Sequence, residues 1–566
     1  MDTEGEARVD PANSGDSSDS PSEREQDGIT RGELLKSAAV AAPAVLLGTE
    51  AAAAAAQVNR RVHRPPHGND VAGMNILVFV TDQQRAVQHF PPGWVARNMP
   101  ALTYVQRTGL TFENAFTNAC MCSPARSTFL SGYFPAQHGV KYTLEENMPA
   151  SEGYPQVPLS THFKNPATVV AAAGYTPVYK GKFHCVKQTD NQGWVPSDVN
   201  QYGFTRWDPP DAGADTTLPQ AGGPPGGPYD NDGRFMHDNG PPWAGDEGVI
   251  EYLESHAHRQ QPFFLVASLV NPHDVLFYPG QLEASEYTQR WLQGEIKLPA
   301  TVNEDLSTKP TVQKQFLHLF NAVPNNALTT PEMKRTYLNF YGNLMRSSDF
   351  YLQQILRTLK RRGMLDNTLV IVTADHGEMG LTHGGLRQKN FNFYEETLRV
   401  PLVYSNPRLF KRPQRSQALV SHVDFLPTLA SLVGAPKRAR ADWQGVDYSD
   451  QILSRSPKPP QDYVVFTYDD FQSGQANGPY PGLPPFKPSP NHIVSIRERR
   501  YKLARYHAPH RPHVQDQWEM YDLKSDPLET INIASPQHHR TPAQKAEFLR
   551  LKAKLEHVEA TRLQPL

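Results

Sequence analysis

The feature that most constrains this chain of 566 residues is a series of short apolar runs that alternate with helical stretches. The runs are rich in β-branched and large apolar side chains, as in strands buried on both faces, and they occupy residues 76–80, 263–270, 369–372 and 402–404. The clearest helical stretch begins with Thr330 as N-cap, presents one apolar face and ends at Gly363. This alternation predicts an α/β protein with a mostly parallel central sheet flanked by helices.

Composition narrows the classes of function. Lys and Arg total 56 against 58 for Asp and Glu, and the net charge of -2 gives no indication of a nucleic-acid partner. No apolar run approaches the length of about 18 residues that a membrane span needs, so we expect none. The 3 cysteines are too few for a disulfide framework in a chain of this length.

The first 56 residues differ from the rest of the chain. Residues 1–27 hold nine acids and two bases in a Ser/Asp/Pro-rich stretch, which predicts a disordered acidic tail. Residues 28–56 resemble a twin-arginine export signal, although Gly32 stands where the second arginine belongs. We therefore expect export to the periplasm or outside the cell, with an Ala-rich helix or linker and a cytoplasmic location as the alternatives.

Polar side chains follow three of the predicted strands at the point where each strand ends. Asp82 and Gln83 follow the first run, His273 follows the second, and Asp375 and His376 follow the third. Singly, each could be a helix cap or a turn residue. Ligands of open parallel sheets gather at the carboxyl ends of the strands, so together these residues predict a site. Carboxylate and amide oxygens with a nitrogen suit a hard cation better than zinc.

One motif carries a family resemblance. The segment Cys122-Ser123-Pro124-Ala125-Arg126 resembles the signature of the formylglycine-dependent (type I) sulfatases of the alkaline phosphatase superfamily, in which a formylglycine-generating enzyme oxidises the cysteine. A lone buried cysteine would usually be an ordinary apolar side chain. A bare thiolate is also a poor ligand for a hard cation, whereas a hydrated aldehyde would present oxygens.

The resemblance extends along most of the chain. Five further motifs match the family in order, and they occupy residues 80–85, 174–184, 271–274, 374–395 and 520–532. The Asp82-Gln83 pair is similar to choline sulfatases and phosphonate monoester hydrolases. The resemblance implies an alkaline phosphatase-like catalytic domain over residues 74–455 and a smaller C-terminal α+β subdomain over residues 456–566.

The resemblance also implies a role for each matching residue. One divalent metal, Ca²⁺ in preference to Mg²⁺ or Mn²⁺, would be held by Asp82, Gln83, Cys122, Asp375 and His376. The implied catalytic residues are formylglycine 122 as nucleophile, Arg126 as its stabiliser, Lys182 and Lys389 as sulfate ligands, His273 as proton donor to the leaving alcohol, and His184 as acceptor of a proton from the second hydroxyl of the hydrate.

Alternatives remain at this point. The same scaffold could hydrolyse phosphonate monoesters or phosphodiesters, and a chain that leaves Cys122 as a thiol could be a non-catalytic binding protein. The expected substrate is a small-molecule or carbohydrate sulfate ester. Aromatic residues in the loops at 190–245 and 471–490 could shape its pocket. The sequence leaves the particular ester and the oligomeric state open.

Overall fold

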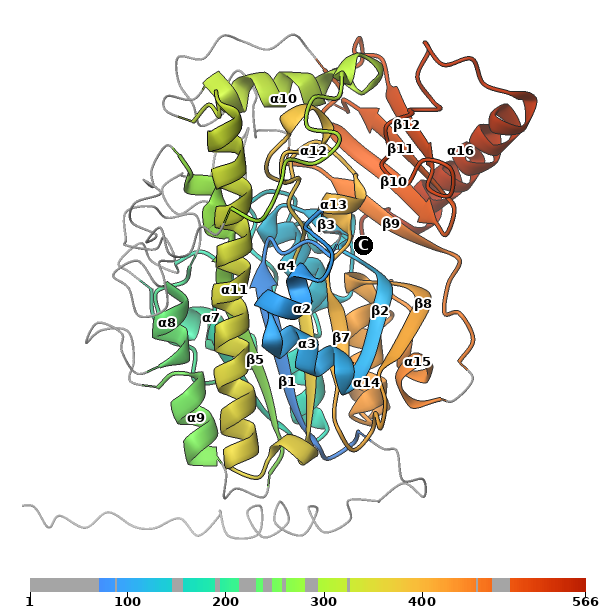
Figure 1. The fold of residues 1–566 in the computed structure, drawn as a ribbon. Helices are drawn as coiled ribbons and strands as arrows, with labels where there is room; N and C mark the ends of the chain where they lie inside the picture. The colour runs from blue at the N-terminus through green and yellow to red at the C-terminus, as the bar shows by residue number, and fades with distance from the viewer. Residues whose placement is uncertain are drawn as a thin grey trace, which may run out of the picture. The chain divides into compact units, whose positions relative to one another are not determined.

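A seven-stranded sheet forms the centre of the fold (Figure 1). In spatial order its strands are β4 (Thr176–Gly181), β5 (Phe263–Pro272), β1 (Asn75–Asp82), β6 (Thr368–Ala374), β7 (Leu402–Ser405), β2 (Gly109–Phe116) and β8 (Gln414–Ser421). All pairs are parallel except the two made by β7, which runs antiparallel to both neighbours. The predicted α/β class with a mostly parallel sheet is therefore confirmed, and the four apolar runs are strands β1, β5, β6 and β7.

The structure, a computed structural model, covers most of the chain after residue 70. It describes residues 71–86, 89–144, 156–188, 194–212, 231–237, 247–256, 261–279, 294–322, 326–454, 457–470, 489–509 and 511–566. The predicted acidic tail and export segment lie outside the described residues, as do much of the loop at 190–245 and nearly all of the loop at 471–490.

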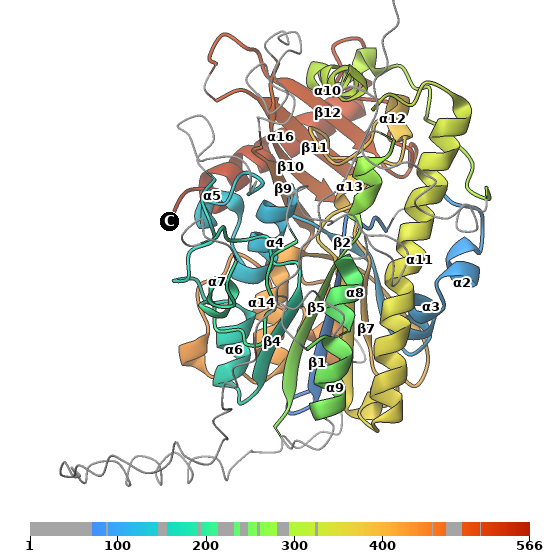
Figure 2. The same cartoon turned by 90° about the vertical axis from the view of Figure 1, so that its left-hand side faces the viewer.

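Helices cover both faces of the sheet (Figures 1 and 2). Successive side chains of β1 alternate between two hydrophobic clusters: Ile76 and Val78 belong to one, Leu77 and Phe79 to the other. The helices in the described residues are α2 (Trp94–Asn98), α3 (Pro100–Arg107), α4 (Cys122–Ser131), α5 (Pro135–His138), α6 (Pro166–Ala172), α7 (Ser197–Asn200), α8 (Asn231–Met236), α9 (Val249–His256), α10 (Thr311–Ala322), α11 (Pro331–Arg361), α12 (Thr382–Gly385), α13 (Glu395–Leu398), α14 (Phe425–Leu432), α15 (Ser449–Leu453) and α16 (Pro542–Arg562). Short 3-10 turns are η1 (His273–Phe277), η2 (Leu306–Thr308), η3 (Leu365–Asn367), η4 (His422–Asp424) and η5 (Lys437–Ala439).

The long helix α11 behaves as its sequence predicts. The side chain of Thr330 accepts a hydrogen bond from the backbone N–H of Met333 and caps the first turn. Its apolar face, with Leu338, Tyr341 and Ile355, is buried in the cluster that contains Leu77. None of the helices among the described residues has the length and apolarity to cross a bilayer.

A second, five-stranded sheet carries the C-terminal part of the chain. Its order is β12 (Gln517–Asp522), β11 (Tyr501–His507), β10 (His492–Glu498), β9 (Tyr463–Tyr468) and β3 (Ala119–Cys120). The smaller C-terminal α+β part is therefore present, and α16 packs against it through Leu551 and Leu555. Strand β3, from much earlier in the chain, pairs with β9 directly before Cys122. The domain limits at residues 455 and 456 stay a prediction.

Candidate active site

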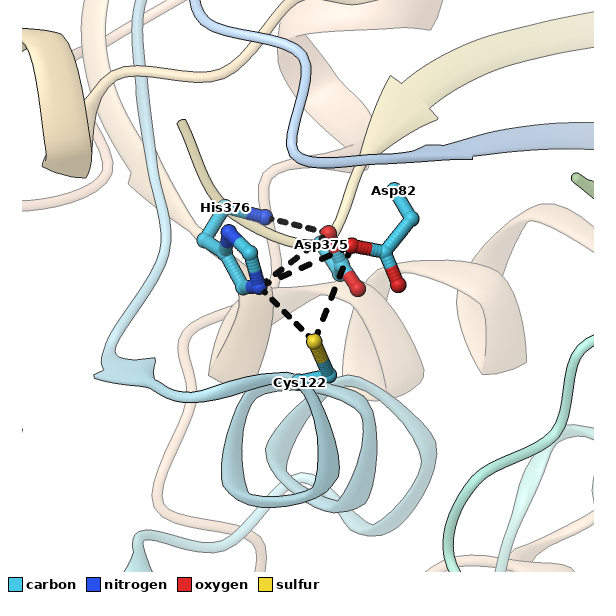
Figure 3. A group of neighbouring side chains, drawn as sticks. All are labelled: Asp82, Cys122, Asp375 and His376. Atoms are coloured by element: carbon cyan, nitrogen blue, oxygen red, sulfur yellow. Dashed lines mark hydrogen bonds and ion pairs between the residues drawn. The ribbon is translucent and has the colours of Figure 1, made fainter. Parts of the chain in front are cut away.

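Four side chains that could hold a metal ion converge where β1 and β6 end (Figure 3). Asp82 is the last residue of β1, Asp375 and His376 directly follow β6, and Cys122 is the first residue of α4. Their ligand atoms all lie within 4.8 Å of one another, and all four residues are buried. The structure thus brings together four of the five predicted metal ligands.

The parallel register of β1 and β6 produces this convergence. Thr81 pairs with Ala374, so the next residues along the two strands, Asp82 and Asp375, lie side by side at the same edge of the sheet. The Asp375 carboxylate also accepts a hydrogen bond of 3.0 Å from the backbone N–H of Gln83. The thiol Sγ of Cys122 lies 3.6 Å from Asp82 Oδ1 and 3.2 Å from His376 Nε2.

The hydrogen bonding of His376 determines which of its two ring nitrogens carries the hydrogen and which keeps a lone pair. Its Nδ1 lies 3.1 Å from the carbonyl oxygen of Gly377, which can only accept, so Nδ1 carries the hydrogen. Nε2 therefore keeps its lone pair and points toward Asp82 and Cys122. Metal-ligating histidines are commonly held this way, by donating their other N–H to a carbonyl or carboxylate.

Arg126 ties the two carboxylates of the cluster together. It lies one turn after Cys122 on α4, and its Nε and Nη2 donate to Asp375 at 2.9 Å and to Asp82 at 3.2 Å. Its Nη1 donates to the hydroxyl of Ser268 at 2.8 Å. Because both carboxylates are buried, these charge-assisted bonds offset part of their desolvation.

Lys182 adds a second cation from the end of β4. Its Nζ lies 2.8 Å from Asp82 Oδ2, and both side chains are fully buried. Burial would raise the pKa of Asp82, but Lys182, His273 and Arg126 together hold it well below its ordinary value. Asp82 is therefore ionised, as a metal ligand must be.

His184, two residues further on, is oriented by the backbone. Its Nε2 lies 2.9 Å from the carbonyl oxygen of Leu144 and so carries the hydrogen. Its buried Nδ1 has no hydrogen-bond partner among the described residues. Burial and the charge of Lys182 both lower the pKa of His184 well below its ordinary value. The residue is a neutral imidazole with one available lone pair.

Gln83, predicted as the fifth metal ligand, has its amide engaged elsewhere. Its Nε2 donates to Glu378 Oε2 at 2.6 Å, and its Oε1 accepts from Lys389 Nζ at 2.7 Å. Glu378 in turn accepts from the hydroxyl of Tyr337 at 2.6 Å. This series of hydrogen bonds orients the Gln83 amide and places the Lys389 ammonium next to it.

His273 opens the turn η1 directly after β5. It is buried, with Nδ1 3.7 Å from Asp274 Oδ1. Burial and the charge of Lys182 lower its pKa well below the ordinary value, whereas the Asp82 carboxylate opposes them. A negatively charged substrate near His273 would raise the pKa again and favour a bound proton.

Cys122 itself is a poor nucleophile as a thiol. Burial, followed by the negative charge of Asp82, raises its pKa to about 12. The other two cysteines, Cys120 and Cys185, are also buried, and each lies in a hydrophobic cluster.

Two residues that position the site residues through hydrogen bonds, Asp211 and Glu378, were not predicted from the sequence. The Asp211 carboxylate accepts from the backbone N–H groups of Phe183 and His184, at 2.8 Å and 2.7 Å, and so holds the loop that carries His184. Asp211 lies in a Pro-rich loop without any motif, so no sequence signal identified it. Glu378 falls inside the motif at 374–395, which was a usable signal.

The expectation that aromatic residues of the loop at 190–245 shape the substrate pocket stays a prediction, and two of these residues are buried. Trp207 and Phe235 are only 1% and 2% exposed. The indole N–H of Trp207 donates to the carbonyl of Gly181 at 3.0 Å. Trp207 therefore supports the end of β4 next to Lys182. The aromatic residues of the loop at 471–488 lie outside the described residues.

This sheet architecture, with an acid, thiol and imidazole cluster at its carboxyl edge, agrees with the comparisons to known protein families. The chain matches the Sulfatase family over residues 74–435, and N-sulphoglucosamine sulphohydrolase, C-terminal, over residues 383–560. The first match covers more than half of the chain, and the protein belongs to the sulfatase family. It is a sulfuric ester hydrolase.

Individual relatives are distant but cover most of the chain. It is 24% identical over 453 residues to a Δ4,5-hexuronate-2-O-sulfatase of Bacteroides thetaiotaomicron, covering 79% of this chain and 81% of that protein. It is 25% identical over 483 residues to a choline-sulfatase of Rhizobium meliloti, covering 83% and 84%. A solved phosphonate monoester hydrolase of Agrobacterium radiobacter shares the fold, with a TM-score of 0.59, 19% identity and coverage of 86% of this chain and 96% of that one.

Proposed function

We propose that this sulfatase cleaves its ester with a formylglycine made from Cys122 and one divalent metal held beside it. The observation that carries the proposal is the position of Cys122 at the centre of the buried donor set, 3.6 Å from Asp82 and 3.2 Å from His376. A thiol with a pKa near 12 would be neutral and weakly nucleophilic there. A hydrated aldehyde at residue 122 would instead present two hydroxyl oxygens.

The donor set fits a hard divalent cation. Asp82, Asp375 and His376 would hold it together with an oxygen of residue 122. Carboxylate oxygens suit Ca²⁺, Mg²⁺ and Mn²⁺ alike, and Ca²⁺ is preferred on the family resemblance. When bound, the metal would supply positive charge that lowers the pKa of an adjacent hydroxyl. Gln83 was predicted to join this set. The bonds of its amide support a different role, the orientation of Lys389.

Lys182 and Lys389 would bind the sulfate group. Lys182 pairs with the Asp82 carboxylate, whereas the Lys389 ammonium donates to the neutral amide of Gln83. The two fixed ammonium groups would stabilise charge that develops on the sulfate oxygens. Arg126 would stabilise the ionised hydroxyl of residue 122.

Two histidines would move the protons. His184 would accept a proton from the second hydroxyl of residue 122 through Nδ1, which has a lone pair and no partner among the described residues. His273 would give a proton to the departing alcohol oxygen, because the bound anion favours its protonated form. The alcohol would then leave as a neutral molecule.

The preferred substrate class is a sulfated carbohydrate. Supporting this choice are the C-terminal match to N-sulphoglucosamine sulphohydrolase and the hexuronate sulfatase among the relatives. A small-molecule ester such as choline sulfate is the second possibility, because a choline-sulfatase is equally similar. The maturation partner would be a formylglycine-generating enzyme.

The proposal is tested by producing the protein with and without a co-expressed formylglycine-generating enzyme. Turnover of 4-nitrophenyl sulfate should depend on that enzyme, and it should be absent in a Cys122→Ala variant of unchanged unfolding midpoint. Equal turnover in both preparations would contradict the formylglycine step.

A phosphonate monoester hydrolase is the second candidate function. The Asp82-Gln83 and Asp375-His376 pairs favour it, since they resemble that group of enzymes as well as choline sulfatases. Comparing kcat/KM for 4-nitrophenyl sulfate with that for an aryl phosphonate monoester decides between them. Much faster cleavage of the phosphonate would displace sulfate hydrolysis as the main activity.

The metal assignment has a test that does not depend on activity. Inductively coupled plasma mass spectrometry should find one divalent metal per chain in the purified protein, and Asp375→Asn should lose it. Gln83→Ala should retain the metal if Gln83 orients Lys389, and a loss of metal in that variant would restore Gln83 as a ligand.

We also propose export through the twin-arginine-like segment at residues 28–56. Support comes from the sequence alone, because these residues lie outside those described. Replacing Arg31 and Lys36 with Gln in the producing cell should retain the protein in the cytoplasm. Unchanged export of that variant would exclude this route.

A further inference from the structure

A basic groove runs along the β8 edge of the seven-stranded sheet. Its volume is about 1290 Å³, and strand β8 forms one of its walls. The lining is completed by residues 408–413 before β8, residues 451–454, Pro457, Pro459, Gln461, Arg499 and Leu110. Strand β8 is the outermost strand of the sheet, so its free edge pairs with no other strand among the described residues.

The charge of this groove is one-sided. No Asp or Glu lines it, and its charged lining residues are Arg408, Lys411, Arg412, Arg415 and Arg499. All five are exposed. A carboxylate partner is present in the described structure only for Arg415, which pairs with Glu113. A groove with such an excess of positive charge contrasts with the net charge of -2 of the whole chain and attracts anions.

Protection of the sheet edge explains only part of this charge. Charged side chains on an outermost strand prevent edge-to-edge association, and Arg415 on β8 serves that purpose. Arg408 lies in the loop before β8, and Arg499 lies in the turn between β10 and β11. Neither is on the exposed strand, yet both face the same groove.

The groove is separate from the candidate active site. Leu110 and Gln414, which line it, lie at the beginning of β2 and β8, and these strands run parallel to each other. Strand β7 is antiparallel to both β2 and β6, so β2 runs in the direction of β6. The lining continues along β8 from Gln414 to Leu419, so the groove follows most of this strand. None of its lining residues belongs to the candidate active site, and strands β7 and β2 lie between β8 and β6.

We propose that this groove binds a sulfated carbohydrate chain and holds a polymeric substrate on the enzyme. The inference rests on the proposed carbohydrate substrate of the active site. Four of the five cations are arginines, whose planar forks match the oxygens of sulfate groups. The exposed amides of Gln414 and Gln417 can hydrogen-bond sugar hydroxyls. The volume exceeds the range of about 300–1,000 Å³ typical of pockets for single small molecules and suits an extended chain.

Occupation of two sites by one polymer would raise the effective concentration of its sulfate esters at the active site. The expected signature is a low KM for long chains that short substrates do not share. Neutralising the groove should raise KM for the polymer and leave turnover of a small ester unchanged.

The test uses the full chain in a Cys122→Ala background, so that no sulfate is removed during binding. Binding of fluorescent heparin, a sulfated glycan, is measured by anisotropy at several salt concentrations. The groove variant carries Arg408→Gln, Lys411→Gln, Arg412→Gln and Arg499→Gln. A control variant with the same change in charge carries Arg335→Gln, Arg357→Gln, Lys360→Gln and Lys545→Gln, four basic residues outside the groove for which the described structure has no ion pair.

We expect the groove variant to bind heparin at least tenfold more weakly than the control variant at about 50 mM salt. The logarithm of its association constant should fall less steeply with the logarithm of the salt concentration, with a slope lower in magnitude by about 3 to 4, or about one for each lost ionic contact. Equal affinity and slope in the two variants would overturn the proposal. Hyaluronan, which has carboxylates without sulfates, should bind more weakly than heparin. Equally tight binding of double-stranded DNA through the same residues would overturn the assignment to a sulfated glycan.

Failure of this inference is distinguishable from failure of the proposed function. With Cys122 intact, both four-residue variants should hydrolyse 4-nitrophenyl sulfate at the wild-type rate, which tests the active site independently. Unfolding midpoints within a few degrees of wild type in both variants establish that the comparison is between folded proteins.

Discussion

Two of the buried clusters of charged side chains differ in how completely their atoms are paired. In the Glu395 cluster (Glu395, Arg497, Lys502 and Glu529), two cations face two carboxylates, with Arg497 3.0 Å and Lys502 3.2 Å from Glu395. Lys502 lies 2.7 Å from Glu529, which also accepts from the backbone N–H of Glu395. This cluster joins α13 to the five-stranded sheet, and each of its charges faces an opposite charge.

The Cys122 cluster (Asp82, Cys122, Asp375 and His376) is different. His376 directs a lone pair into it, and nearby His184 has a nitrogen without a partner among the described residues. Burial and charge are shared by both clusters, so neither property identifies a functional site. The property that identifies a functional site is the presence of donor atoms with free lone pairs at the carboxyl edge of a parallel sheet. Substitutions should therefore reduce the rate in one cluster and the stability in the other.

The largest effect is expected for Cys122→Ala. Removal of the nucleophile should lower kcat for 4-nitrophenyl sulfate by about 10⁴-fold or more. The unfolding midpoint should change little, because Cys122 belongs to none of the hydrophobic clusters among the described residues. Steady-state kinetics and thermal unfolding of the same preparation provide both readouts. A variant that keeps a tenth of the activity would remove Cys122 from the mechanism.

His273→Gln should follow, with a loss of about 10³-fold for an alkyl sulfate, in the range of general acid catalysis. The loss should be much smaller for 4-nitrophenyl sulfate, because 4-nitrophenolate leaves without a proton. The comparison of kcat for the two esters measures this. Equal losses for both esters would contradict a role as proton donor.

Lys502→Met tests the other cluster. It leaves the carboxylates of Glu395 and Glu529 buried beside fewer cations, and breaking a buried pair in this way costs about 3–5 kcal/mol. Urea denaturation should report that loss in the free energy of unfolding, while kcat of the folded variant stays close to wild type. A stable Lys502→Met protein with strongly reduced kcat would reverse the distinction between the clusters.

The smallest effect concerns pH and His383. This side chain is buried 2.7 Å from Glu304 and 3.8 Å from Glu396; burial would lower its pKa, but the two carboxylates raise it to about 9. The folded-state pKa lies above the unfolded one, so the stabilisation is fully present below about pH 6.5 and is lost as the pH rises through about 9.

His383 should therefore lower the free energy of unfolding of the wild type by at most about 3 kcal/mol as the pH rises from 6.5 to 9.5. His383→Gln should show a flatter profile over the same window. Identical pH profiles for the two proteins would exclude His383 as the group responsible.

Local patterns predicted much of this structure. The apolar runs locate four strands of the sheet, and Thr330 and Gly363 delimit α11, because caps and periodicity act over a few residues. The polar residues after each strand converge as expected because parallel register brings strand ends together. The motif identified Cys122 as the reactive cysteine, but it did not predict which side chains would surround it in the folded protein.

Contacts between distant segments were not predictable in the same way. Gln83 has a positive φ of 67°, and its amide bonds to Glu378 and Lys389, which lie about 300 residues later. The bond between Lys502 and Glu395 spans 107 residues. Such pairings depend on how the sheets pack, and a single sequence carries no local signal for them.

The measurement that tests the central claim most directly is mass spectrometry of the peptide containing residue 122, made on protein of known specific activity. The account predicts an aldehyde in place of the thiol, in a fraction that rises in proportion to sulfatase activity across preparations. Fully active protein that carries only the unmodified Cys122 thiol would contradict it.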